Sequence, residues 1–464
     1  MQNSNEFMGT EPIGRLLVKM SLPAIVAQLI NLLYNLVDRV YIGHMPENGA
    51  LALTGVGVCM PIIMIVTAFA ALVSNGSAPR ASMAMGKGDP DAAEEILGNS
   101  FILQLIISAV LTAILLLFNR PLLLAFGASE NTIEYATQYM NIYAIGTVFV
   151  QLTLGMNAFI TAQGFSMIGM LSVLIGAVCN IILDPIFIYV FGMGVRGAAL
   201  ATILSQAVST IWVLRFLTGK KTILHIKKKY FRMKKSIVFP GIALGMAPFI
   251  MQASESVIII CFNASLLKYG GDVAVGAMTI MSSAMQFALL PVQGLGQGAT
   301  PIASYNFGAA NVSRVKRTFW LLLFSSMGYT ILFWALAMLF PTVFAQIFSS
   351  DSSLVSYAAW ALRIYLAGIG VFGAQLACQM LFISIGDAKA SIMVAVMRKF
   401  VLLLPLIYIL PHLVEDQTFG VYLAEPIADV LAVTFTVTLF TIRFRKAMAK
   451  LEKEGAARRK TGNV

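Results

Sequence analysis

Long apolar runs separated by short polar stretches recur along the whole chain. Each run is about 20 to 30 residues long, enough to cross a hydrocarbon core of roughly 30 Å as a helix. Backbone groups in lipid must be hydrogen-bonded within their own segment, so the predicted fold class is an all-α membrane protein. The pattern predicts twelve transmembrane helices, within Leu16–Ile42, Ala50–Val73, Ile96–Phe118, Ile133–Ile160, Met167–Phe191, Gly197–Leu217, Val238–Leu267, Val273–Tyr305, Thr318–Phe340, Leu354–Ile385, Ile392–Leu410 and Phe419–Ile442.

The end of the second run is repeated at the end of the eighth. GSAPRASMAMG begins at Gly76 and GATPIASYNFG begins at Gly298, with Gly, Pro, Ala, Ser and Gly at the same five positions. The two start positions differ by 222 (298 − 76), and this offset indicates two copies of one six-helix unit. We interpret the Gly and Pro residues as shaping a helix end, with substrate contact as the alternative. The same offset relates Tyr135-Ala136 to Tyr357-Ala358, Ile142-Tyr143 to Ile364-Tyr365, Gly146 to Gly368 and Gly164 to Gly386.

Two copies of an even number of spans have the same orientation in the membrane. They should be related by a pseudo-twofold axis along the membrane normal, with a cavity between two six-helix bundles. The predicted organisation is an N-terminal lobe (1–218), a basic linker (219–236), a C-terminal lobe (237–445) and a basic tail (446–464).

Composition and charge support a membrane protein and suggest its orientation. Only 11% of residues are charged and the mean hydropathy is +0.83, whereas a soluble domain has about 25% charged residues. The net charge is +11, and 27 of the 32 Lys and Arg residues, with Arg398 and Lys399 among them, fall on the side of the termini. This asymmetry predicts that both termini are cytoplasmic. We interpret the eight basic residues of Lys220–Lys235 as a topology signal, and we expect no nucleic-acid partner.

The remaining chemistry gives no sign of an enzyme. The four cysteines lie in apolar runs without motif spacing, and the three histidines form no cluster. A nucleophile motif and a phosphate-binding glycine loop are also missing from the sequence. We therefore expect a protein that is not an enzyme and needs no cofactor.

Polar residues within the apolar runs of the first half need a reason, because they are costly in a bilayer. Asn180 and Asp184 are four residues apart on one helical face, and Pro185 cannot donate to the carbonyl of Ile181. In the first span, four polar residues spaced 3, 4 and 3 share a face: Gln28, Asn31, Asn35 and Asp38. Further polar candidates are Tyr139, Tyr143, Asn157 and Thr202.

These residues could form a hydrogen-bond network that stabilises the bundle, or a cation or proton site. Two carboxylates in a low dielectric cannot cheaply both stay charged without a cation between them. Their oxygen atoms are the ligands that hard cations such as Na⁺ prefer. The second interpretation is the one we favour.

The second half has its own polar set. Gln252 and Glu255 lie in the seventh span, and Glu425 and Asp429 are four residues apart in the twelfth. Arg398 could pair with these acids and serve only to hold helices together, and Arg363 is another candidate. One face of the eighth span carries Gln286, Gln293 and Gln297. We expect a candidate C-lobe polar site at Glu255, Gln252, Gln286, Arg398 and Asp429, and a substrate cavity lined by Gln28, Asn31, Asn35 and Gln293.

The chain resembles the MATE (multidrug and toxic compound extrusion) family across all twelve spans, and three strings carry the resemblance. They are SLPAIVAQLINLLYNLVDRVYIG (Ser21–Gly43), CNIILDPIFIYVFGMGVRGAALAT (Cys179–Thr202) and the doubled Gly-x-x-Pro string. The string of the fifth span is specific and is most similar to the MepA-like and DinF-like bacterial branches. The resemblance implies export of bulky, often cationic drugs coupled to H⁺ or Na⁺. It also implies an N-lobe cation site, with candidate Na⁺ ligands, at Asp38, Asn180, Asp184 and Thr202, with Tyr139 and Asn157 close by.

The same resemblance bears on the second half. Glu255 matches the seventh-span acid that the NorM-like branch uses for coupling, but the tenth span of this chain has no acid to complete that site. Coupling through the N-lobe is therefore favoured.

Together with the polar residues, the resemblance implies a monomeric antiporter of a bacterial inner membrane that exports amphiphilic or cationic small molecules and contacts membrane lipids. A lipid-linked oligosaccharide flippase of the same superfamily is the alternative. Acids, amides and apolar residues, rather than cationic ones, dominate the spans, which disfavours it. An open channel fits the duplicated two-bundle plan less well than a gated cavity does.

Overall fold

The computed structural model describes residues 6–46, 48–349 and 351–460, and every regular element in these ranges is a helix. The two halves of the chain form two helical bundles, which we call the N-lobe (α2–α8) and the C-lobe (α9–α16). The N-terminal half comprises α1 (Glu6–Thr10), α2 (Ile13–Gly43), α3 (Gly49–Gly86), α4 (Pro90–Leu117), α5 (Asn119–Ala125), α6 (Ile133–Ala162), α7 (Ser166–Pro185), the π-helix η1 (Ile186–Val190) and α8 (Val195–Leu217). The C-terminal half comprises the 3₁₀-helix η2 (Lys228–Tyr230), α9 (Lys235–Gly308), α10 (Val312–Leu339), α11 (Pro341–Phe348), α12 (Ser352–Tyr365), α13 (Ile369–Ser384), α14 (Ala388–Val396), the π-helix η3 (Met397–Leu403), α15 (Leu404–Ile409), the 3₁₀-helix η4 (Leu410–His412) and α16 (Gln417–Lys460).

The helices of the described ranges account for the twelve predicted spans. Ten are long and apolar enough to cross a bilayer, and α12 with α13, bent by 50°, forms an eleventh span. The 74 residues of α9 are far more than one crossing of a bilayer needs. This helix turns back at Gly271, where φ is 66° and ψ is −163°, and so supplies two spans. A positive φ of this kind is natural only for glycine.

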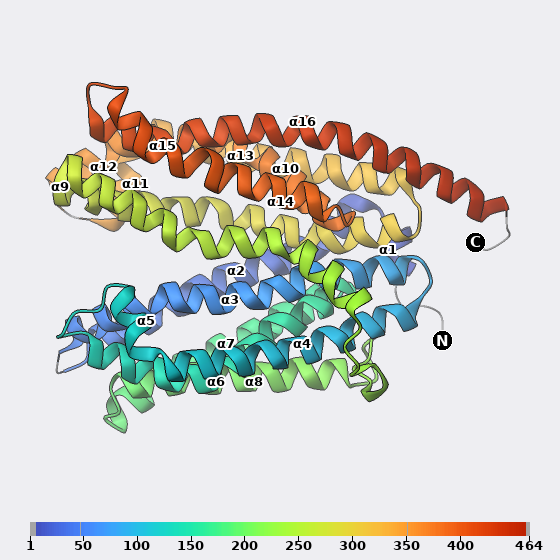
Figure 1. Ribbon diagram of the computed structural model, residues 1–464, viewed down its shortest axis with the longest axis horizontal. Coiled ribbons are helices and arrows are strands. Elements are labelled where there is room, and N and C mark those ends of the chain that lie inside the picture. Colours follow the sequence, from blue (N-terminus) through green and yellow to red (C-terminus); the bar gives the residue numbers. More distant parts are fainter. Residues whose placement is uncertain (1–5, 47, 350, 461–464) are drawn as a thin grey trace.

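Both termini and the linker lie at one end of the molecule, which we call the terminal side (Figure 1). The bend of α9 lies at the opposite end, which we call the far side. α16 continues without a break to Lys460, and Met448 and Leu451 pack with Val315 of α10. The boundary predicted at residue 445 therefore falls inside a helix, because the tail has apolar residues to bury.

The repeated strings make a close crossing between the lobes on the terminal side. A Cβ atom at Gly86 would lie 2.0 Å from the carbonyl oxygen of Tyr305, and one at Gly308 would lie 2.0 Å from that of Met83. A Cβ at Gly76 would meet the backbone of Gly241 at 1.9 Å. Only glycine allows the backbones of two helices to approach this closely. The strings therefore serve interlobe packing.

The two segments that precede the lobes are bound by the opposite lobe. Asn306 Nδ2 and Arg314 Nη2, both in the C-lobe, each donate to the carbonyl of Met8 in α1 at 2.9 Å. In the linker, Thr222 Oγ1 and the backbone N–H groups of 223 and 224 all donate to Oε1 of the N-lobe residue Gln163, at 2.8–2.9 Å. These contacts hold both leading segments against the terminal side.

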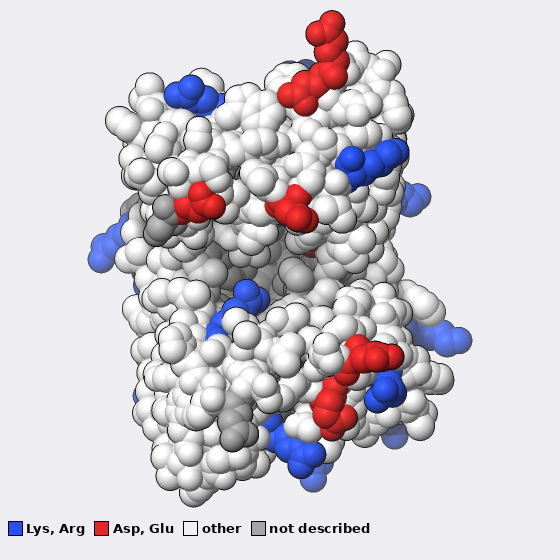
Figure 2. All heavy atoms as spheres, turned by 90° about the vertical axis from the view of Figure 1, so that its left-hand side faces the viewer, with Lys and Arg blue, Asp and Glu red and all other residues white. Residues whose placement is uncertain are grey.

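The lobes separate toward the far side. One row of contacts between them runs along α3 and the first arm of α9, from Gly76 to the contact between Met64 Sδ and Ser256 Oγ at 3.7 Å. Figure 2, which looks onto the far side, shows the surface hollowed between the two halves. The molecule is thus closed at the terminal side and open at the far side.

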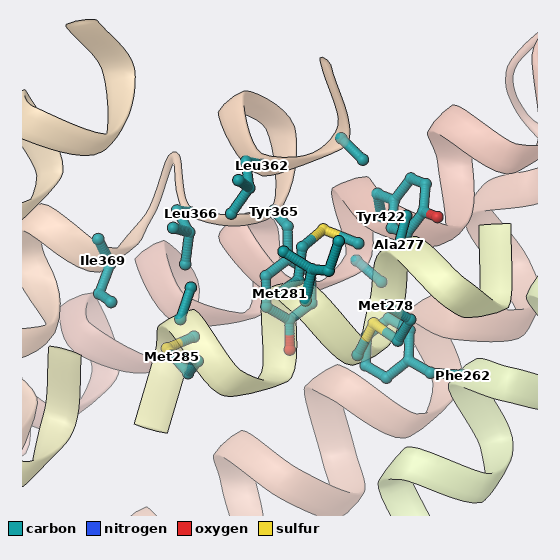
Figure 3. Packing of buried hydrophobic residues seen from close by; sticks show 14 of the residues in the cluster. Phe262, Ala277, Met278, Met281, Met285, Leu362, Tyr365, Leu366, Ile369 and Tyr422 are labelled. Atoms are coloured by element: carbon teal, nitrogen blue, oxygen red, sulfur yellow. The ribbon is translucent and has the colours of Figure 1, made fainter. Parts of the chain in front are cut away.

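Methionines of α9 fill the core of the C-lobe. Met278, Met281 and Met285 are spaced 3 and 4, so they share one helical face, and they pack against α12 and α13 (Figure 3). Tyr422 of α16 closes the far end of this core and donates its hydroxyl to the carbonyl of Ala274 at 2.8 Å. These sulfur atoms lie inside a lobe and do not face the hollow.

Candidate functional site

Four helices of the N-lobe bring five of the predicted polar residues together. The carboxyl groups of Asp38 on α2 and Asp184 on α7 face each other within hydrogen-bonding reach. Asn180 Nδ2 donates to Asp184 Oδ1 at 3.2 Å. The Tyr139 side chain of α6 lies near Asp38 and near Thr202 on α8, whose hydroxyl donates to the carbonyl of Ala198 at 3.0 Å.

The oxygens of this cluster are buried and incompletely paired. Asp38, Asn180 and Asp184 are 6%, 2% and 0% exposed. One oxygen of each, namely Asp38 Oδ1, Asn180 Oδ1 and Asp184 Oδ2, has no hydrogen-bond partner. Burying unpaired acceptors is costly. Three such oxygens in one cluster form a site that suits a small hard cation or a shared proton.

The backbone is irregular next to this cluster. Pro185 follows Asp184, and η1 begins immediately after it as a π-helical turn. Proline removes one backbone donor, and π-helical turns are frequent at functional sites. The segment carrying Asp184 can therefore change its bend more easily than a regular helix.

Asn157 lies away from this cluster, although it was expected close to it. Its Nδ2 donates to the carbonyl of Gly169 at 3.3 Å. Tyr139 and Asn157 are on one helix, α6, and about five helical turns separate them. The sequence pattern could not reveal this, because a shared face says nothing about depth.

The polar face of α2 continues from an interlobe contact into the hollow. On the terminal side, Ser21 Oγ donates to the carbonyl of Leu295 on α9 at 3.3 Å, and a Cβ at Gly294 would meet Ile25. The next turns of the same helical face carry Gln28, Asn31 and Asn35, which are partly or fully exposed. Gln293, beside Gly294, is also partly exposed. These four residues are accessible at the level where the lobes separate or between that level and the far side.

The C-lobe holds a network of five charged groups. Arg398 donates to Asp429 Oδ1 through Nε at 2.9 Å and through Nη2 at 2.7 Å, and Nη2 also reaches Glu425 Oε1 at 2.7 Å. The neighbouring Lys399 donates to Glu255 Oε2 at 2.5 Å. The guanidinium of Arg398 also lies 4.5 Å from the centroid of the Phe372 ring.

Arg398 and Lys399 therefore do not belong to the terminal side, and the assignment of both residues to that side was wrong. Both are 4% exposed and lie in η3, inside the span predicted as Ile392–Leu410. The count of terminal-side basic residues becomes 25 (27 − 2), which leaves the charge asymmetry in place. Lys399 is the site residue that the sequence analysis missed. Its position well inside an apolar run was the available signal.

The remaining C-lobe candidates are not part of this network. Gln252 Nε2 donates across the lobes to Thr67 Oγ1 of α3 at 2.7 Å. Gln286 is exposed on the second arm of α9. Glu255 and Gln286 are almost equally far along the chain from the bend at Gly271, one before it and one after, so they lie at similar depth on the two arms.

The linker is more ordered than a loose basic loop. Lys227 Nζ pairs with Glu94 Oε2 of α4 at 2.5 Å, and Lys234 pairs with Glu95. The ring of Phe231 stacks on Phe101 with centroids 5.5 Å apart. Part of the linker's positive charge is thus neutralised by the N-lobe. Among the described residues, no group of three or more His, Cys, Asp or Glu side chains is arranged to hold a metal ion.

Comparisons with known proteins agree with the duplicated architecture. The family model described as MatE matches residues 23–186 and again 247–409. The chain is 24% identical to the multidrug export protein MepA of Staphylococcus haemolyticus, covering 92% of this chain and 94% of that protein. It is 21% identical to the MepA of Staphylococcus aureus (strain NCTC 8325 / PS 47), covering 86% of this chain and 87% of that protein.

Solved structures show the same fold. A crystal structure of MATE in the bent conformation superposes with a TM-score of 0.90 at 23% identity, covering 98% of this chain and all of that one. The outward-facing conformation of a multidrug resistance MATE family transporter of the MOP superfamily gives 0.89 at 23% identity, covering 97% and 99%.

Proposed function

The chain belongs to the MATE family of multi-pass membrane transporters, and from that premise we propose that it is an antiporter that uses H⁺ or Na⁺ entry to export amphiphilic, mostly cationic organic compounds. Members of this family are transporters and not enzymes. The MepA relatives are described as multidrug export proteins, which supports an organic small molecule as the exported species.

The observation that carries the proposal is the buried carboxyl pair of Asp38 and Asp184. Coupling requires a group whose charge or occupancy changes during the cycle, and a low-dielectric pair of acids cannot cheaply hold two negative charges. The unpartnered Asn180 Oδ1 and the nearby Thr202 add neutral oxygens. In this proposal H⁺ or Na⁺ is transported cargo, bound between the carboxyl groups.

Binding of that cation should pull two helices together. With the cation present, repulsion between the carboxylates of α2 and α7 is cancelled and the helices can approach each other. When the cation leaves, repulsion returns and the irregular turn at Pro185 and η1 takes up the change in bend. Since α2 also packs on α9 at Ser21 and Gly298, its movement can loosen the contact between the lobes.

The same proposal assigns sides to the molecule. We place the terminal side in the cytoplasm of a bacterial inner membrane, in keeping with the positive-inside rule. The hollow then faces outward, and this form is the one that releases substrate and accepts the coupling cation. The hollow lies between two lobes of one chain, so a monomer surrounded by membrane lipids is sufficient.

A lipid flippase is the weaker candidate. Such a protein would be expected to present free cationic side chains to phosphate groups in the cavity. The cationic residues buried in the C-lobe, Arg398 and Lys399, are bound to acids.

Ion-driven uptake of ethidium into everted vesicles, whose outer surface is the cytoplasmic face, tests the proposal. We expect Asp38→Asn and Asp184→Asn to reach the membrane and to lose coupled export, because each keeps the side-chain size and removes one charge. Asn180→Ala should weaken coupling. Asp272→Asn, at an exposed acid beside the bend of α9, is the matched control and should export at the parental rate. Parental export by both site variants would contradict the proposed N-lobe site.

A further inference from the structure

The charged network of the C-lobe is one positive charge short. It contains three carboxylates, Glu255, Glu425 and Asp429, and two cations, Arg398 and Lys399, so its formal charge is −1. Arg398 serves two carboxylates at once, and Asp429 Oδ2 is buried without a hydrogen-bond partner. A buried carboxylate without full compensation is costly. The network therefore has room for one more cationic group.

Glu255 is the member of the network that an incoming molecule can reach. Its side chain is 43% exposed, whereas those of Lys399 and Arg398 are 5% exposed. Gln252, three residues before Glu255 and on the same helical face, donates to Thr67 of α3 in the other lobe, so this face of α9 lies between the lobes. A molecule in the hollow meets the Glu255 carboxylate, which Lys399 holds from the interior of the C-lobe.

Lys399 has alternative carboxylate partners if it leaves Glu255. It lies close enough to both Glu425 and Asp429 to act electrostatically on each of them. The long, flexible lysine side chain can therefore exchange one carboxylate for another without becoming unpaired. The unpartnered Asp429 Oδ2 is an acceptor for its ammonium group.

We propose that Lys399 is a specificity-determining residue, whose ammonium group is a tethered counter-ion of Glu255 that the cationic group of a substrate displaces. Displacement transfers Lys399 toward Glu425 and Asp429, and the substrate supplies the missing positive charge. The site then selects monovalent organic cations, because a neutral molecule cannot replace the positive charge of Lys399 beside Glu255. This inference rests on the proposed export of organic cations.

Binding of ethidium to the purified full-length protein, measured by fluorescence, tests this role. Lys399→Met removes the competitor and leaves Glu255 accessible, so we expect ethidium to bind about tenfold more tightly or better, the lower end of what one close charge pair contributes. Affinity for an uncharged phenanthridine of similar size should be unchanged. Lys268→Met is the matched control, since it removes an exposed lysine of α9 that lies over the Tyr269 ring, and it should bind ethidium with parental affinity.

Three further variants, Lys399→Arg, Glu255→Gln and the double variant Glu255→Gln/Lys399→Met, complete the test. Lys399→Arg keeps the counter-ion and should retain weak, parental binding. In Glu255→Gln/Lys399→Met the carboxylate is gone, so the gain should disappear, and the cycle isolates the coupling between the two residues. If Lys399→Met does not fold, Glu255→Gln alone must still lower ethidium affinity.

Three results would overturn the inference. They are parental or weaker ethidium binding by folded Lys399→Met, equal gains for ethidium and the uncharged phenanthridine, and a gain that persists without the Glu255 carboxylate. In each of these cases a parent protein that exports ethidium leaves the proposed function intact. A parent that neither binds nor exports ethidium contradicts both.

Discussion

An alanine at Gly86 should open the terminal side without unfolding either lobe. Gly86 and Gly308 are the last positions of the two repeated strings, and each touches the backbone of the opposite lobe. A Cβ at Gly86 would lie 2.0 Å from the carbonyl oxygen of Tyr305, whereas ordinary contact begins near 3.4 Å. The backbones must therefore move apart to admit the methyl group, because neither partner is the end of a flexible side chain.

The cost falls on one conformation only. Inserting one methyl group into a packed contact typically costs about 1–3 kcal/mol. The crossing exists only when the terminal side is closed, so this cost raises the free energy of the closed form relative to the open form. A difference of this size corresponds to a shift of about 5- to 150-fold in their ratio.

Thiol labelling can measure that shift. In a background without the four native cysteines, Ser21→Cys places a thiol at a position that is 2% exposed between α2 and α9. Gly86→Ala should raise the rate of its reaction with N-ethylmaleimide by that factor. Gly57→Ala, on the same helix, meets nothing within 4 Å and should leave the rate unchanged. Equal rates for the two variants, with intact folding, would refute the crossing as a gate contact.

Four other perturbations follow from the contacts described above. Arg398→Met should destabilise the protein by about 3–5 kcal/mol, because it leaves Glu425 and Asp429 buried without their cation, and a parental thermal midpoint in detergent would contradict this. Gln163→Leu removes the acceptor of three hydrogen-bond donors in the linker, so trypsin should cleave residues 219–236 faster than in the control Gln138→Leu. Equal cleavage in the two variants would argue against binding of the linker by Gln163. Arg314→Gln should release α1, so a thiol introduced by Gly9→Cys should be labelled faster than it is with Arg314 in place. An unchanged labelling rate would mean that the hydrogen bonds from Arg314 to the carbonyls of Met8 and Glu11 do not hold this segment. Lys228→Cys should react with an impermeant maleimide in everted vesicles but not in intact cells, and Glu130→Cys on the far side should show the reverse. Labelling of Lys228→Cys in intact cells would contradict the proposed topology.

Much of the fold follows from the sequence because the bilayer imposes strong rules. Apolar length predicted all twelve spans, including two that share the single kinked helix α9 and one that is broken between α12 and α13. The constant offset between the repeated strings predicted the duplication, since the equivalent glycines make equivalent contacts. Helix ends were less predictable. α3 extends to Gly86 and α16 to Lys460, because their polar ends pack on protein and need not stop at the lipid boundary.

The candidate site was predictable only where helical spacing carries the information. The pair Asn180 and Asp184 and the first-span face ending at Asp38 follow from spacing alone. Asn157 lies at a different depth in the bundle from the one expected. Lys399 is buried in an ion pair with Glu255, which was not expected because one sequence does not reveal which acid faces which base across helices. The segments bound by the opposite lobe were likewise hidden, since they depend on backbone carbonyls such as that of Met8.

Substrate-driven movement of the coupling cation in reconstituted vesicles tests whether the pair Asp38 and Asp184 couples cation entry to export. An outward-directed ethidium gradient is imposed on the protein, and H⁺ and ²²Na⁺ movements are recorded in parallel. We expect one of the two cations to move against the ethidium flow through the parent and through Asp272→Asn, and we expect this movement to be lost in Asp38→Asn and in Asp184→Asn. Parental counter-movement through both site variants, or no cation movement in a parent that transports ethidium, would contradict this coupling.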